Sequence, residues 1–85
     1  MREFQSPDEA CAEFAKSGEK LLVKRIDDLV FIEGTEEALT RFAELVLAQA
    51  RYRKDDGFEV SPNGPGSLIF ADESNLGIYL RTVRS

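Results

Sequence analysis

The chain has 85 residues, and 16 acidic against 11 basic side chains give it a net charge of −5. This length accommodates one domain. Because there is no histidine and only one cysteine, the sequence excludes histidine-assisted nucleophilic catalysis, an intrachain disulfide and a cysteine-based zinc cluster. The acidic balance argues against a nucleic-acid partner, since phosphate-binding surfaces are basic.

No segment of the sequence is suited to a membrane. A spanning helix needs about 20 consecutive apolar residues, and the longest apolar runs, Leu21 to Val23 and Leu29 to Ile32, are far shorter. Met1 to Phe14 is charged throughout and lacks the apolar centre of a secretory signal. We therefore expect a cytoplasmic protein.

The first predicted element is a helix from about Pro7 to Ser17. Ser6 is a suitable N-cap, Glu9 completes a capping box, and Gly18 provides a stop. Cys11 falls on the apolar stripe of this helix, so we interpret it as a buried, unreactive thiol.

Two strands follow, Lys20 to Arg25 and Leu29 to Glu33, with Ile26-Asp27-Asp28 as the turn between them. The short connection implies antiparallel pairing. Apolar residues occur at both alternating positions, so the hairpin is apolar on both faces over part of its length. Either both faces are covered within the monomer, or one is a contact surface.

The longest predicted element is a helix from about Glu36 to Arg53. Thr35 is its expected N-cap, and Asp55-Asp56-Gly57 breaks it. A basic cluster of Arg51, Arg53 and Lys54 lies where the helix should end. We interpret this cluster as a complement to the C-terminal helix dipole.

The last third predicts three strands: Phe58 to Val60, Ser67 to Phe70 and Leu76 to Val83. Residues 61–66 contain two prolines and two glycines and are predicted to form a loop. The predicted order αββαβββ indicates an α+β two-layer sandwich, in which two helices cover an antiparallel sheet of about five strands.

Two sequence features superficially suggest chemistry. Gly64-Pro65-Gly66-Ser67 resembles a phosphate-binding loop, but a strand rather than a helix is expected to follow it, and proline removes a donor. Four adjacent carboxylate pairs could bind a metal or act as acid and base, but turn propensity and helix dipoles explain all of them: Asp27-Asp28, Glu36-Glu37, Asp55-Asp56 and Asp72-Glu73. We therefore expect no enzyme activity, no metal and no cofactor.

Part of the sequence resembles the immunity protein 32 family. The similarity lies in VFIEGTEEAL from Val30 to Leu39, in FAEL from Phe42 to Leu45, in the Gly-Pro-Gly loop with Leu68-Ile69-Phe70, and in SNLGIYL from Ser74 to Leu80. The resemblance implies a small, non-enzymatic α+β protein that neutralises a toxin delivered between competing bacteria. The chain departs from the family pattern at Phe58-Glu59-Val60, where we associate the family with a histidine.

Three functional hypotheses remain. The first is a non-enzymatic immunity protein that binds a cognate toxin, with the acidic balance suiting a basic, nuclease-like partner. Its candidate contacts are Asp27, Asp28, Asp55, Asp56, Asn63, Asp72, Glu73 and Tyr79. The second is a self-associating module, a homodimer formed through the two-faced hairpin. The third is a small enzyme or ligand sensor built on carboxylates.

Overall fold

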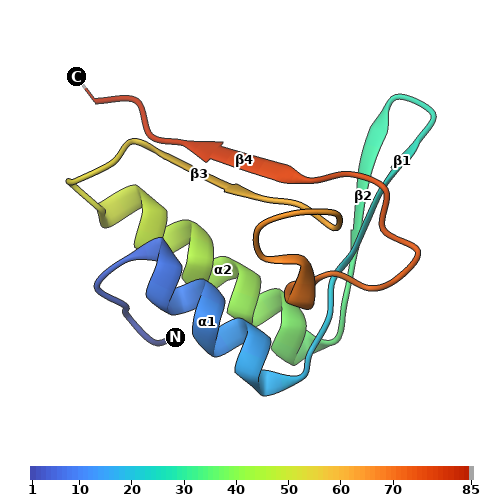
Figure 1. Ribbon diagram of the computed structural model, residues 1–85, viewed down its shortest axis with the longest axis horizontal. Coiled ribbons are helices and arrows are strands. Elements are labelled where there is room, and N and C mark those ends of the chain that lie inside the picture. The colour runs from blue at the N-terminus through green and yellow to red at the C-terminus, as the bar shows by residue number, and fades with distance from the viewer. Residues whose placement is uncertain (85) are drawn as a thin grey trace.

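The computed structural model describes residues 1–84 and contains two helices, four strands and one short 3₁₀ helix (Figure 1). In chain order the elements are α1 (Pro7–Ser17), β1 (Leu22–Ile26), β2 (Leu29–Glu33), α2 (Glu36–Arg51), β3 (Gly57–Val60), η1 (Ser67–Ile69) and β4 (Ile78–Arg81).

Both helices begin where the sequence predicts, because each has a side-chain cap. Ser6 Oγ accepts a hydrogen bond from Glu9 N at 3.1 Å, and Thr35 Oγ1 accepts one from Ala38 N at 3.0 Å. Gly18, with φ of 77°, ends α1 in the left-handed conformation. The prediction for α1 is confirmed, whereas α2 ends two residues earlier than predicted because Tyr52 is already extended.

Strands β1 and β2 form the predicted antiparallel hairpin, in a register that pairs Leu22 with Glu33. Ile26, predicted to lie in the turn, is instead the last residue of β1 and pairs with Leu29. Asp27 turns the chain with φ of 55°. A positive φ at the first turn position gives a twist that suits a two-residue hairpin, and aspartate tolerates it.

Strands β3 and β4 form a second antiparallel pair, which lies over α2 (Figure 1). Phe58, Val60, Ile78 and Leu80 share the face that packs on the core, while Glu59 and Tyr79 face away from it. Helices α1 and α2 pack side by side beneath this pair.

The sequence prediction of about five strands in one sheet is wrong. Ser67–Ile69 is a 3₁₀ helix, because Gly66 turns the chain with φ of 74° and Ile69 N then donates to Gly66 O at 3.1 Å. The four strands form two separate two-stranded sheets. The fold class α+β is confirmed, whereas one sheet covered by two helices is not observed.

The core lies between the two helices, the base of the β1–β2 hairpin and the inner face of the β3–β4 pair. Its largest fully buried side chains are Phe14, Leu21, Leu45, Ile69, Val23 and Val60. Burial of each such side chain contributes about 1.5–3 kcal/mol. The core therefore fixes the base of the hairpin, and the hairpin extends beyond it.

Candidate interaction surface

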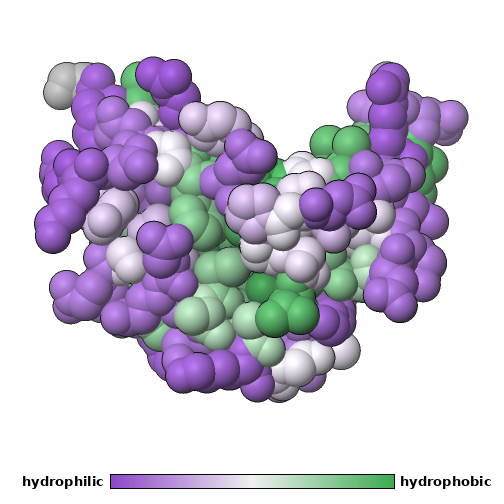
Figure 2. All heavy atoms as spheres, viewed as in Figure 1, coloured by the Kyte–Doolittle hydropathy of each residue, from purple (hydrophilic) through white to green (hydrophobic). Residues whose placement is uncertain are grey.

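The β1–β2 hairpin projects from the body of the protein and exposes apolar side chains (Figure 1). Leu29 and Val30 are each 66% exposed, and Ile26 and Ile32 are about 40% exposed. We call these four residues the apolar hairpin surface. Figure 2 shows hydrophobic surface on the hairpin, which stands apart from the rest of the molecule. Clustered exposed apolar side chains on a small protein mark a contact surface.

The register of the hairpin places this surface on both of its faces. Ile26 and Leu29 lie on one face with Phe31, and Val30 and Ile32 lie on the other. On the second face only the base is covered, since Leu21 and Val23 are fully buried. The sequence left open whether the monomer covers both apolar faces of the hairpin or leaves one as a contact surface. The body of the protein covers only the base of the hairpin, so the rest remains available for contact.

The two outer edges of the hairpin differ. Residues 69–76 cover the edge of β1: Leu21 N donates to Ile69 O at 2.8 Å, and Val23 O accepts from Asn75 N at 3.0 Å. Because alternate residues of a strand point to opposite edges, the outward main-chain groups of β2 are those of Val30 and Ile32. Within residues 1–84, no hydrogen bond reaches these groups.

The tip of the hairpin carries charges of both signs. Asp27 and Asp28 form the turn, but Arg25 Nε donates to Asp27 O at 2.8 Å. Lys24 Nζ lies over the Phe31 ring, 6.0 Å from its centroid. The bond from Arg25 is to the backbone oxygen of Asp27 and not to its carboxylate, but it holds a positive charge beside the turn, so the tip is not a purely acidic surface.

Asp55, Asp56 and Tyr79, predicted as contacts, come together at the other end of the molecule. They line a shallow depression, and basic side chains border it as well: Arg53, Lys54 and Arg81. Asp55 Oδ1 accepts from Gly57 N at 3.1 Å, and Asp56 Oδ1 accepts from Arg84 Nε at 3.2 Å. These internal bonds and neighbouring cations reduce the negative potential that the sequence suggested.

The remaining predicted contacts lie on loops beside the hairpin. Asn63 and Asp72 border one depression, and Glu73 borders another with Glu33. Lys20 lines both depressions, and its Nζ donates to Leu68 O at 2.5 Å. The eight predicted residues therefore fall into separate regions rather than one site.

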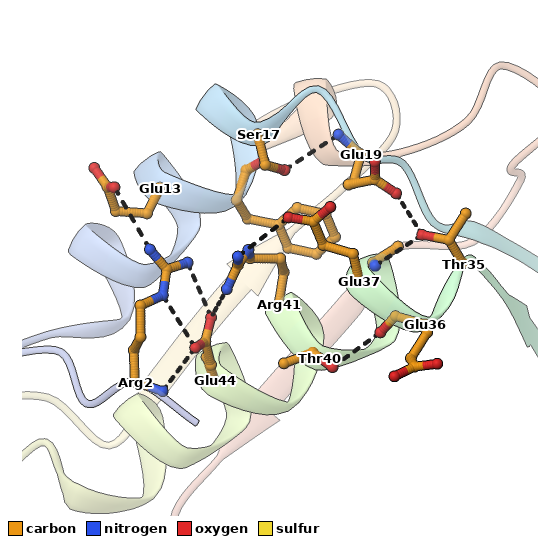
Figure 3. Close-up of polar contacts among 12 residues, drawn as sticks. Arg2, Glu13, Ser17, Glu19, Thr35, Glu36, Glu37, Thr40, Arg41 and Glu44 are labelled. Carbon is orange, nitrogen blue, oxygen red and sulfur yellow. Dashed lines mark hydrogen bonds and ion pairs between the residues drawn. The ribbon is translucent and has the colours of Figure 1, made fainter.

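The most perturbed carboxylate, Glu44, was not singled out from the sequence. It is 2% exposed and lies between α1 and α2, where its oxygens accept hydrogen bonds from Arg2 and Arg41 (Figure 3). Burial alone would raise its pKa, but the hydrogen bonds from the two arginines outweigh burial and lower the pKa from 4.5 to about 2. A carboxylate held ionised in this way is a structural anchor and a poor general acid or base near neutral pH.

The single thiol also shows no sign of activation. Cys11 is half-buried, and burial, assisted by the charge of Asp8, raises its pKa above the ordinary 9.0. A raised pKa lowers the fraction of reactive thiolate. This direction agrees with the predicted unreactive role, although the side chain is only partly enclosed.

No group of three or more potential metal-ligating side chains occurs among residues 1–84. In the same residues, neither helix is long and apolar enough to cross a bilayer.

This chain was compared with models of protein families, with curated proteins and with solved structures, and no match was found in any of the three. Membership of the immunity protein 32 family therefore stays a prediction.

Proposed function

We propose that this protein acts by binding another protein through the β1–β2 hairpin, and that the partner is a cognate toxin which it neutralises. The observation that supports the proposal is the apolar hairpin surface, which exposes Leu29 and Val30 on opposite faces of a projecting element. Leaving such side chains in water is unfavourable, and a partner that covers them gains binding energy.

The toxin as partner comes from the sequence resemblance. An inhibitor needs a contact surface rather than catalytic groups, and a projecting apolar hairpin meets that need. The net charge of −5 would speed encounter with a basic partner and make the association rate fall with salt. Since Lys24 and Arg25 accompany the tip carboxylates, the apolar residues are expected to supply most of the affinity.

The test is affinity capture followed by a toxicity assay. The wild-type protein and Leu29→Lys are used as baits on a lysate of the source cells. We expect one stoichiometric partner to be retained by the wild type and lost by the variant. Expressed alone, that partner should stop growth, and co-expression of this protein should restore it.

Val83→Lys is the matched control, because Val83 is 86% exposed but lies outside the hairpin. It should retain the partner as well as the wild type does. Equal capture by Leu29→Lys and wild type would refute the hairpin as the contact surface. A captured partner with no effect on growth would refute the toxin assignment.

A further inference from the structure

We infer that the open edge of β2 pairs with β2 of a second copy of this chain, giving a four-stranded antiparallel sheet across a two-fold axis. The inference concerns the protein in the absence of any toxin. It goes beyond the proposed function and does not depend on it.

The first argument is the unsatisfied backbone. The N–H and C=O groups of Val30 and Ile32 point away from β1 and have no partner within the described residues. Natural sheets usually protect an edge with charge, proline, a bulge or a covering segment. Leu29 to Ile32 offers none of these, whereas residues 69–76 cover the edge of β1.

The second argument is that the edge is complementary to itself. In an antiparallel pair centred on Phe31, Val30 lies opposite Ile32 of the second copy, and their outward groups form a hydrogen-bonded pair. Phe31 then lies opposite Phe31, and Leu29 lies opposite Glu33. No carboxylate of β2 faces another carboxylate in this register, and the apolar pairs are of the kind that stabilises sheets.

The third argument is closure. Because the outer edge of β1 is already hydrogen-bonded to residues 69–76, the combined sheet ends at β1 of each copy. The arrangement stops at two chains and does not continue into a fibre. The contact is short, and each copy carries a charge of −5, so we expect a micromolar dissociation constant that falls as salt screens the repulsion.

The experiment combines sedimentation, which measures the mass of the species in solution, with hydrogen exchange of the backbone amides. Sedimentation of the wild type from micromolar to millimolar concentration should show a monomer–dimer equilibrium that added salt shifts toward the dimer. In the same range, the exchange of the Val30 and Ile32 amides should slow as concentration rises. The amides of Leu29 and Phe31 face β1 and should be protected at every concentration.

Val30→Lys should raise the dissociation constant of the dimer by at least about tenfold, because it places a charge at the paired edge. Val83→Lys, which makes the same change at an exposed valine elsewhere, should leave it unchanged. A monomer at every concentration would overturn the inference. So would a dimer in which the Val30 and Ile32 amides exchange freely, since its interface would lie elsewhere.

If the dimer is absent, the proposed function is unaffected, because capture of a toxin is measured separately. If both are present, they share the hairpin, and an excess of toxin should dissociate the dimer.

Discussion

Arg2 and Glu44 lie 42 residues apart in the sequence and are joined by three hydrogen bonds. Arg2 N and Nε both donate to Glu44 Oε2, at 2.8 and 3.1 Å, and Arg2 Nη2 donates to Oε1 at 3.1 Å. The same Oε1 accepts from Arg41 Nη1 at 2.8 Å (Figure 3). One buried carboxylate thereby fixes the segment before α1 to the surface of α2.

Glu44→Gln should destabilise the protein by about 2 kcal/mol, because the uncharged amide accepts fewer and weaker bonds than the buried carboxylate. Arg2 and Arg41 would then have only the more exposed carboxylates of Glu13 and Glu37 as counter-charges. Urea denaturation measures the loss. Glu37→Gln is the control, since among residues 1–84 that exposed carboxylate bonds only Arg41, and its replacement should cost less than about 0.5 kcal/mol. Equal costs for the two variants would show that Glu44 is not an anchor.

The same carboxylate should make stability depend on acid pH. Its pKa is lowered on folding from 4.5 to about 2, so its stabilising contribution is complete above about pH 4.5 and is lost as pH falls toward about 2. The difference in unfolding free energy between wild type and Glu44→Gln should therefore shrink over this range. A difference that stays constant with pH would contradict the ionised, arginine-bound state.

Gly66→Ala should cost about 2–3 kcal/mol. Gly66 has φ of 74°, and an added Cβ would lie 2.5 Å from Val60 Cγ1 in the core. Gly64, in the same loop, has 3.7 Å to its nearest such neighbour and no positive φ, so Gly64→Ala should change stability by less than about 0.5 kcal/mol. Thermal unfolding of the two variants distinguishes them, and a similar loss in both would contradict the contact with Val60.

Cys11 should react slowly with iodoacetamide in the folded protein at mildly alkaline pH. Burial, then Asp8, raises its pKa, so little thiolate is present, and unfolding in urea should speed the reaction. Asp8→Asn should increase the folded-state rate modestly, whereas Asp28→Asn at the hairpin tip should not. A folded protein that reacts as fast as the unfolded chain would refute the unreactive role.

The helices and the hairpin could be predicted because their signals are local. Ser6 and Thr35 cap the residues that immediately follow them, and the Asp27-Asp28 turn sets the pairing of adjacent strands. Ser67 to Phe70 has the apolar composition of a strand, and here local pattern misleads. The preceding Gly66 turn closes a 3₁₀ helix instead, and Ile69 is placed fully in the core.

The candidate interaction surface also has features that the sequence shows and features that only folding brings together. Apolar residues at both alternating positions of the strands identified a hairpin that is apolar on both faces, but did not show which of these side chains the body of the protein covers. Glu44 has no distinguishing local pattern, since its partners are Arg41, one turn away, and Arg2 in a different segment. The carboxylate pairs were visible as charges, whereas Arg84, which donates to the Asp56 carboxylate, lies 28 residues away in the sequence and becomes its neighbour only on folding.

The sequence by itself determined the α+β class, the start of each helix and the antiparallel hairpin with its turn at Asp27-Asp28, because capping and turn formation involve residues close together in the chain. Only the tertiary structure decided that the strands form two separate sheets, that residues 69–76 cover β1, and that β2 keeps an open edge. Those outcomes depend on which distant segments compete for the same backbone hydrogen bonds and the same core volume, and local sequence does not encode that competition.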